Sequence, residues 1–189
     1  MPRRLHRPHD RPLRLLHQSK LMADFENALG KQDGVAGAHC IHELWMRGEF
    51  PQNIELALER LWQSAAKTIP EWLPMHYVSW LPQAYEVASR FTAGAKGKSN
   101  IYLVLLDYSD RRGDTHGVYV GMSEYTPAAR FDQHKAGIRS AGSVLKRGIE
   151  MLTGPTLHLQ RIARREAARI ETELAEALAD AGIKVEGGH

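Results

Sequence analysis

Two short apolar runs in the second half of the chain most constrain its fold. The first, residues 101–106, is rich in β-branched and aromatic residues and lies between polar segments. Its length and boundaries favour a strand buried on both faces over a helix. The second run, residues 116–122, follows a polar, glycine-containing turn at residues 110–114 and ends at Gly121. The two runs are therefore expected to form a β-hairpin.

A helix is predicted directly after the second run. Thr126 and Pro127 have the residue types that open helices, as N-cap and first helical residue. Arg130 and His134 follow at a separation of four residues, which places both side chains on one face of the helix. Gly137 is expected to end it.

The remainder of the second half predicts a helix over residues 143–152, a third strand over 156–159 and a long helix over about 162–181. Gly182 supplies the stop for the long helix. Its apolar residues recur at helical spacing and form one stripe. Glu171 lies at the edge of that stripe, so its carboxylate can reach a cleft while the helix stays packed, whereas its neighbouring carboxylates can point outward.

The first half of the chain has a different character. Residues 21–29 and 53–69 show helical spacing, the latter with Trp62 on its apolar face, and prolines divide the rest into short pieces. All four tryptophans lie in this half, which indicates an apolar core or an interface of its own; they are Trp45, Trp62, Trp72 and Trp80.

The predicted fold class is α/β, of the α+β type. A small antiparallel three-stranded sheet flanked by helices occupies residues 98–189. A helical region of unknown role, residues 21–95, and a basic N-terminal arm, residues 1–20, precede it. Residues 94–99 are expected to link the two parts.

Residues 100–188 resemble the GIY-YIG endonuclease family. The first family motif, Gly-Ile-Tyr, corresponds to Asn100-Ile101-Tyr102, with the glycine replaced, and the second, Tyr-Ile-Gly, to Tyr119-Val120-Gly121. The family's arginine and the histidine one turn beyond it match Arg130 and His134. Its metal-binding glutamate matches Glu171, which opens the stretch Glu171-Thr172-Glu173-Leu174; Glu173 is the alternative. Many members have an asparagine after the last helix, and here residues 186–189 are Glu-Gly-Gly-His instead.

This resemblance implies a metal-dependent hydrolysis of phosphodiester bonds. Glu171 would bind one Mg²⁺ or Mn²⁺, because Mg²⁺ keeps several waters and needs few protein carboxylates. Arg130 would hold a phosphate oxygen through its planar guanidinium. Tyr102 or Tyr119 would take the proton from an attacking water, and His134 would relay that proton or contact phosphate. A free phenol has a pKa of about 10, so either tyrosine needs a nearby cation.

Charge is unevenly distributed along the chain, whose formal net charge is +3. Residues 1–22 carry six basic side chains against Asp10 alone, and residues 96–150 carry nine basic against six acidic. Both segments are where a polyanion is expected to bind. The expected partner is nucleic acid, DNA in preference to RNA, and the oligomeric state is left open.

Several other classes of protein are disfavoured. Cys40 is the only cysteine, which excludes an intramolecular disulfide and favours a cytoplasmic location. No apolar run is long enough to span a bilayer. The segment at residues 39–43, His-Cys-Ile-His-Glu, lacks a second pair of zinc ligands and is expected to be helical instead. Residues 94–99 do not have the spacing of a phosphate-binding loop.

Two functions from different classes remain. The first is a metal-dependent endonuclease, with the N-terminal half choosing the substrate. The alternative is a catalytically inactive module of the same fold that binds nucleic acid or another protein. Glu171 discriminates between them, because its replacement by alanine should abolish cleavage and leave binding intact.

Overall fold

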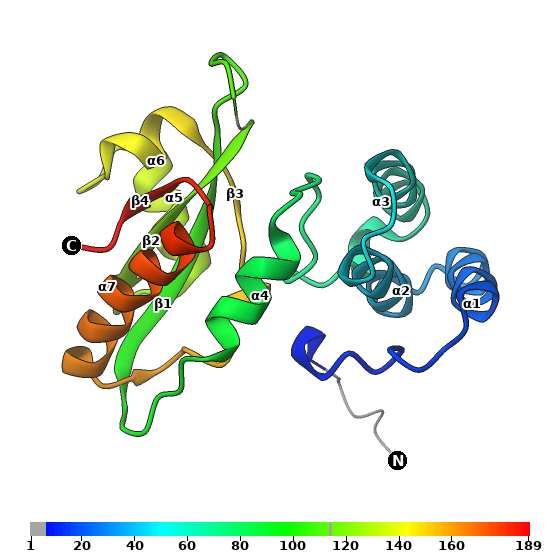
Figure 1. The fold of residues 1–189 in the computed structure, drawn as a ribbon, viewed down its shortest axis with the longest axis horizontal. Coiled ribbons are helices and arrows are strands. Elements are labelled where there is room, and N and C mark those ends of the chain that lie inside the picture. The colour runs from blue at the N-terminus through cyan, green and yellow to red at the C-terminus, as the bar shows by residue number, and fades with distance from the viewer. Residues whose placement is uncertain (1–6, 114) are drawn as a thin grey trace. The chain divides into compact units, whose positions relative to one another are not determined.

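The computed structural model describes residues 7–113 and 115–189. These divide into two compact units, with the division between Pro82 and Gln83 in the sequence. Unit 1 is helical and unit 2 contains a sheet (Figure 1). Among the described residues, no helix has both the length and the apolar character needed to cross a membrane.

Unit 1 is built around α2 (Gly34–Met46), which has the largest share of buried residues of its helices. Both α1 (Gln18–Gly30) and α3 (Pro51–Ala65) pack against α2. Single turns of 3₁₀ helix, η1 (Pro8–Asp10) and η2 (Ala66–Thr68), precede and follow this group in the sequence. The predicted helices at 21–29 and 53–69 are confirmed as α1 and as α3 with η2, and the helical prediction for residues 39–43 is confirmed in α2.

The tryptophans of unit 1 differ in their environments. Trp45 is buried, and its indole N–H donates to the carbonyl of Val78 at 2.9 Å. Trp62, expected on the inner face of its helix, is 56% exposed, so that expectation is wrong. It occupies a solvent-facing position of α3, where Ile54, Leu58 and Leu61 fill the core instead.

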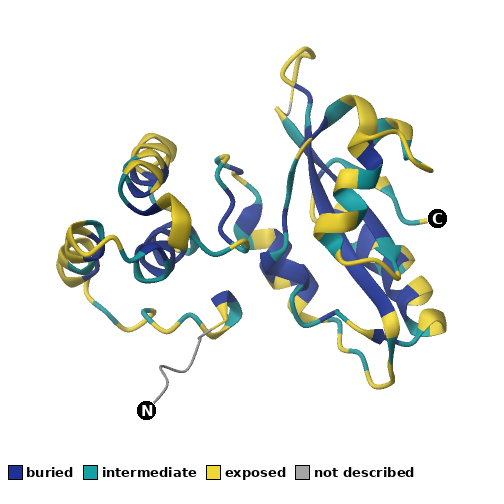
Figure 2. Cartoon of the chain, turned by 180° about the vertical axis from the view of Figure 1, so that it is seen from behind, coloured by how far each residue is buried: buried dark blue, intermediate teal, exposed yellow. Residues whose placement is uncertain are grey.

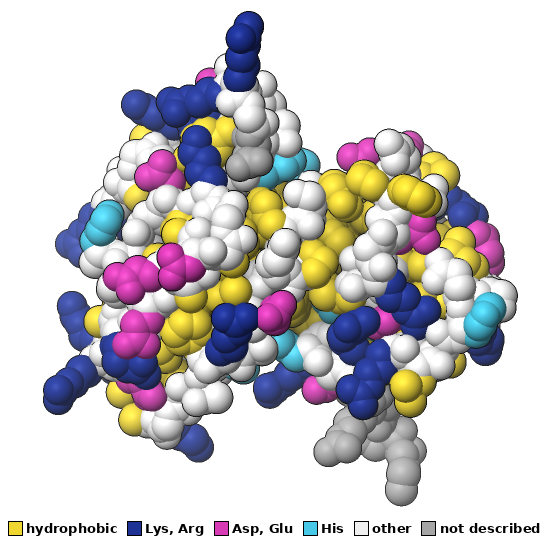
Figure 3. Space-filling model, viewed as in Figure 1, with side chains coloured by type: hydrophobic (Ala, Val, Ile, Leu, Met, Phe, Trp, Pro, Cys, Tyr) yellow, Lys and Arg dark blue, Asp and Glu magenta, His cyan; other side chains and the backbone are white. Residues whose placement is uncertain are grey.

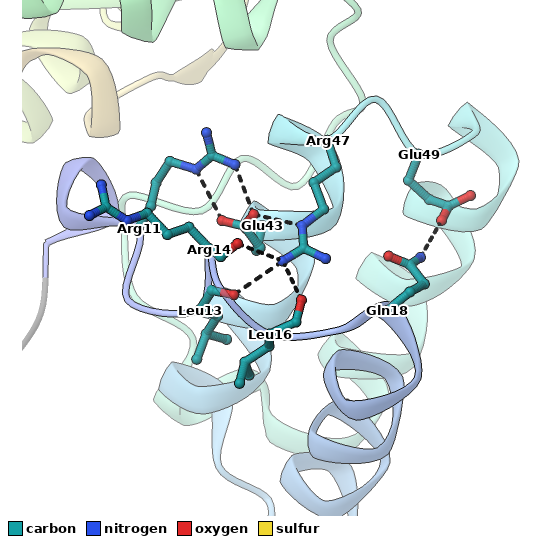
Figure 4. Close-up of polar contacts among 8 residues, drawn as sticks. All are labelled: Arg11, Leu13, Arg14, Leu16, Gln18, Glu43, Arg47 and Glu49. Atoms are coloured by element: carbon teal, nitrogen blue, oxygen red, sulfur yellow. Dashed lines mark hydrogen bonds and ion pairs between the residues drawn. The ribbon is translucent and has the colours of Figure 1, made fainter.

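The segment before α1 is held on α2 by two charged residues (Figure 4). Arg47 donates from its guanidinium to three backbone carbonyls, those of Leu13, Arg14 and Leu16, at 2.9–3.2 Å. Glu43 is buried and accepts hydrogen bonds from both Arg11 and Arg47. Residues 11–16 therefore form a strap that α2 fixes in place.

Unit 2 contains a four-stranded mixed sheet with the order β3-β1-β2-β4. The two long strands, β1 (Lys96–Asp107) and β2 (His116–Ser123), form the predicted antiparallel hairpin. The first four residues of β1 belong to the segment that the sequence predicts as a linker. On its other edge β1 pairs antiparallel with β3 (Gly148–Met151), and β2 pairs parallel with β4 (Val185–Gly187).

The predictions for residues 143–159, and with them the predicted sheet, are wrong. The helix expected over residues 143–152 ends early, as α6 (Gly142–Arg147), and its second half is β3. No strand forms over residues 156–159: Thr156 is the last residue of the short 3₁₀ helix η3 (Gly154–Thr156), and residues 157–159 turn after it. The third strand therefore lies earlier than expected, and β4 makes the sheet four-stranded and mixed instead of three-stranded and antiparallel.

Helices cover both faces of this sheet. The helices α5 (Pro127–Lys135) and α6 pack on β1 and β3, whereas α7 (Arg164–Asp180) packs on β1 and β2. Figure 1 shows α7 in front of the sheet, and the division between the two units falls within α4 (Leu81–Ser89). The side of β1 toward α6 carries one row of large residues, Tyr102, Val104 and Leu106, which Tyr108 continues directly after the strand; the row packs with Val144. β1 is buried over most of its length (Figure 2).

Candidate active site

Three aromatic side chains of unit 2 meet at one place on the sheet. Tyr102 comes from β1, Tyr119 from β2 and His134 from α5. The ring centroids of the tyrosines are 6.1 Å apart, and that of His134 lies 6.0 Å from Tyr102 and 5.8 Å from Tyr119. Three elements that are separate in sequence therefore place three titratable groups within mutual contact.

Gly121 makes this arrangement possible. In the hairpin register it lies opposite Tyr102, two residues after Tyr119. A Cβ atom at position 121 would lie 2.5 Å from the hydroxyl oxygen of Tyr102 and 2.8 Å from Cε1 of Tyr119. Real side chains do not approach so closely, so only glycine lets both phenol rings lie over this strand.

The hydrogen bonds of His134 fix its tautomer. The backbone N–H of Ala141 points at Nδ1 with a distance of 3.1 Å, and an N–H can only donate, so Nδ1 must be the acceptor. The proton of the neutral ring is then on Nε2, which lies 2.9 Å from the hydroxyl oxygen of Tyr102. Burial lowers the pKa of His134 to about 4, and the charge of Arg130 contributes to this. His134 is therefore a neutral donor to Tyr102.

Both tyrosines are weaker acids here than in water. Burial is the main reason that the pKa of Tyr102 is raised, and the neighbouring Tyr119 adds to it while Arg130 opposes it. Burial also raises the pKa of Tyr119, and the charge of Glu171 adds to this while that of Arg130 opposes it. His134 therefore donates to Tyr102, whose ring lies against that of Tyr119. Tyr119 is the less buried of the two phenols.

Arg130 is held at the site by uncharged groups. Its guanidinium donates to the backbone carbonyls of Ile138 at 3.3 Å and Arg139 at 2.7 Å, and to Oε1 of Gln133 at 3.0 Å. Among the described residues, no carboxylate forms an ion pair with it. The positive charge is thus fixed in position by the loop after α5 and not neutralised, which suits a group that binds an anion.

The structure distinguishes between the two candidate glutamates on α7. Glu171 is only 8% exposed, and it is close enough to Tyr119 for its charge to raise the pKa of that phenol. Glu173 forms a salt bridge with Arg169 on the helix surface. Of the two, Glu171 is therefore the carboxylate whose charge reaches Tyr119.

Burial raises the pKa of Glu171, and the backbone N–H of Met122 and the charge of His189 only partly oppose this. A buried carboxylate whose ionised form is disfavoured gains from a nearby cation. Mg²⁺ is bound by one or two carboxylates together with water and substrate phosphates, so a single glutamate fits this ion. Within residues 7–113 and 115–189, no cluster of three or more His, Cys, Asp or Glu residues forms a complete metal cage.

Asn100 stands where the resemblance would have glycine, and its side chain links three segments around the site. Its amide donates to the carbonyl of Tyr125 at 2.9 Å, just before α5, and its side-chain oxygen accepts from the backbone N–H of Arg161 at 3.0 Å. The sequence did not predict this role. The one signal for it is a polar amide at the start of a buried strand.

Compared with known proteins, the chain matches no family model, no curated relative and no solved structure. The likeness to GIY-YIG endonucleases therefore depends on the motif residues and their order in this sequence.

Proposed function

We propose that this protein is a metal-dependent endonuclease that hydrolyses phosphodiester bonds in nucleic acid, DNA in preference to RNA. The observation that supports it best is the convergence of Tyr102, Tyr119, Arg130 and His134, with Glu171 beside them. These groups supply what the hydrolysis needs: a proton acceptor, a fixed cation for phosphate and a carboxylate for a metal ion.

Tyr119 is assigned the proton-accepting role. Tyr119 would act as its phenolate, the form that the charge of Arg130 and a bound cation would favour. The phenolate takes the proton from the water that attacks phosphorus, while the new phosphorus–oxygen bond forms and the leaving oxygen departs with the electron pair of the broken bond. Tyr102 is held by its hydrogen bond with His134 and its ring lies against Tyr119, so it positions the base. Arg130 binds a non-bridging oxygen of the phosphate.

Glu171 is the residue that would hold the metal ion. Bound Mg²⁺ or Mn²⁺ would polarise the phosphate and offset the carboxylate charge that raises the pKa of Tyr119. Burial disfavours the ionised form of Glu171. Without a metal ion, the ionised carboxylate would therefore lower the free energy of unfolding.

Cleavage of labelled duplex, single-stranded, flap and four-way-junction DNA with Mg²⁺, Mn²⁺ or EDTA tests the proposal. We expect Glu171→Gln to lower metal-dependent cleavage at least about a hundredfold and to bind DNA in EDTA like the wild type. Glu173→Gln, on the same helix, is the matched control and should cleave normally. If Glu171→Gln cleaves at the wild-type rate, the metal assignment is wrong.

A stability measurement gives a second readout of Glu171. Its folded pKa is raised, so it favours folding at low pH, and this contribution is lost as the pH rises through the folded pKa. Glu171→Gln should therefore be more heat-stable than the wild type at pH 7.5, with a difference that shrinks toward pH 4.5. Mg²⁺ should stabilise the wild type alone.

The assignment of the two phenols is tested by single removal of their hydroxyls. Tyr119→Phe should lose about 10²–10⁴-fold in rate, the usual contribution of a general base, and Tyr102→Phe should lose less. The reverse order would give the proton-accepting role to Tyr102. Salt-sensitive DNA binding by a wild-type protein that cuts no substrate would favour the alternative, a catalytically inactive binding module.

A further inference from the structure

Three cationic side chains from distant parts of the sequence gather on the ring of Tyr108 in unit 2. Lys184 Nζ lies 3.7 Å from the ring centroid, Arg147 Cζ 4.5 Å and Arg111 Cζ 5.8 Å. They come from the segment before β4, the end of α6 and the β1–β2 loop. Tyr108 itself is only 2% exposed, because these and neighbouring side chains cover it.

Only part of this charge is compensated within the protein. Arg147 pairs with Asp110 at 2.7 Å and donates to the carbonyl of Asp107, so its position is fixed. Arg111 and Lys184 have no carboxylate partner among the residues that the structure describes. The π face of Tyr108 attracts cations weakly compared with a carboxylate. Cations held so near one another repel, and an external anion would relieve that repulsion.

Further basic side chains extend this surface. Lys135, Lys146 and Arg147 line an open pocket of about 340 Å³ at the end of α6, together with Asp107 and Asp110. In Figure 3, Lys and Arg side chains gather around the β1–β2 loop of unit 2. We call this surface the Tyr108 patch. Its members are Arg111, Lys135, Lys146, Arg147 and Lys184.

The Tyr108 patch is separate from the candidate active site but lies on the same side of the sheet. Tyr102 and Tyr108 belong to one row along β1, six residues apart. At about 3.4 Å per residue in an extended strand, this is roughly 20 Å. Successive phosphates of one strand of a duplex are displaced by about 3.4 Å along the helix axis, so for a duplex whose axis runs along β1 the two sites are separated by about six nucleotides.

We infer that the Tyr108 patch binds the phosphate backbone of a nucleic acid about six nucleotides away from the bond that the candidate active site would cleave. This inference rests on the proposed function for its substrate. The sign and extent of the charge favour a chain of phosphates. Within the described part of unit 2, the five basic side chains of the patch outnumber the carboxylates beside them, those of Asp107, Asp110 and Glu186. The contacts are sequence-independent and position the substrate.

The test is binding of a labelled 20-base-pair DNA duplex in EDTA, measured by fluorescence anisotropy from 50 to 200 mM NaCl. The patch variant is Arg111→Gln with Lys184→Gln, the two cations that have no carboxylate partner among the described residues. The control is Lys31→Gln with Lys67→Gln, exposed cations of unit 1, which changes the net charge equally. A rescue variant, Arg111→Lys with Lys184→Arg, keeps both charges.

We expect the patch variant to bind at least about tenfold more weakly at 100 mM NaCl. Its plot of log K against log[NaCl] should be shallower by about 0.9 for each phosphate that the variant no longer neutralises. The control and the rescue variant should bind like the wild type, and equal unfolding temperatures would show that the patch variant is folded.

Wild-type binding by the patch variant overturns the inference, as does an equal weakening of binding in the control. Tighter binding of poly-glutamate than of DNA at the patch would assign it to an acidic protein and also overturn it. Because no metal is present, these outcomes are independent of cleavage. A protein that binds DNA through the patch but cuts nothing would refute the proposed nuclease activity and leave the patch in place.

Discussion

Gly121 affects both the packing of the sheet and the position of the two tyrosines at the candidate site. It lies in the middle of a regular hairpin, where a β-branched residue would ordinarily favour the strand. Its hydrogen atom instead faces the phenol of Tyr102, and a Cβ atom would overlap both tyrosine rings. Gly121 thus replaces the β-branched residue that a strand normally favours, and it does so next to two titratable groups. Such a departure from local preference is typical of a functional site.

Gly121→Ala should therefore displace the phenols. We expect a decrease of about 1–3 kcal/mol in the free energy of unfolding, as for other overpacked sites, and a larger fractional decrease of any cleavage activity. Urea denaturation, the near-ultraviolet spectrum of the tyrosines and the cleavage assay would measure these effects.

Gly142 is the matched control for this substitution. A Cβ atom there would have no neighbour within 4 Å, and the residue lies in α6. Gly142→Ala should be neutral or slightly stabilising, because alanine favours the helix and restricts the unfolded chain. If Gly121→Ala were equally neutral, the tyrosines would not need to lie over the strand.

At the scale of the elements, local signals predicted the hairpin and α5 well. The cap at Thr126 is confirmed, since its side-chain oxygen accepts from the N–H of Ala129. These features depend on turn residues and caps that lie next to one another in sequence. Tyr102 and His134 come together because a hairpin and the next helix leave few alternative placements.

The remaining elements depend on partners distant in sequence. Val144, Leu145, Ile149 and Leu152 have helical spacing. Residues 148–151 nevertheless pair with the edge of β1 as a strand, which leaves Leu145 44% and Ile149 36% exposed. The three residues of β4 show no strand pattern in the sequence, and they form a strand because they pair with β2. Likewise, the backbone carbonyls that bind the guanidinium of Arg130 are positioned by the path of the loop after α5. The residue types in that loop do not predict this path.

The strap in unit 1 depends on a single residue of α2's C-terminal end. Arg47 supplies three of its hydrogen bonds to backbone carbonyls, and the buried carboxylate of Glu43 positions its guanidinium (Figure 4). Arg47→Ala should release residues 11–16 and leave Glu43 with Arg11 alone. Amide hydrogen exchange should accelerate in the strap and at the start of α1, with little change in α3.

Gln18→Ala is the control for the strap. Gln18 also links the beginning of α1 to the region after α2, through an exposed hydrogen bond to Glu49 at 2.9 Å. Exposed bonds of this kind contribute little, so exchange in the strap should stay as in the wild type. Unchanged exchange in Arg47→Ala would show that packing alone holds the strap.

For the molecule as a whole, the two units differ in their response to acid. Each contains a buried neutral histidine: burial, with the charge of His39, lowers the pKa of His42 to about 4 in unit 1, and His134 has a pKa of about 4 in unit 2. A histidine with a lowered pKa stabilises the fold above pH 6.5. That contribution is lost as the pH falls toward 4, because the unfolded chain binds the proton more readily.

Two buried glutamates, Glu43 in unit 1 and Glu171 in unit 2, make the acid response of the two units unequal. Hydrogen bonds from Arg11 and Arg47 outweigh burial and keep the pKa of Glu43 below its ordinary value, so unit 1 loses further stability in acid. Glu171 has a raised pKa and acts in the opposite direction in unit 2. Between pH 7 and 4.5, each histidine should lower the free energy of unfolding by about 2 kcal/mol, and unit 1 should become the less stable unit.

The aromatic residues allow the two units to be followed separately. All four tryptophans precede residue 82, so their fluorescence reports on unit 1, whereas five of the six tyrosines lie in unit 2. Urea unfolding at pH 4.5 should show the tryptophan transition at lower urea than the tyrosine circular dichroism, with a smaller separation at pH 7. In His42→Gln the pH shift of the tryptophan transition should shrink. A tryptophan transition that does not move between pH 7 and 4.5 would contradict this prediction, because unfolding of unit 1 would then take up no proton at His42.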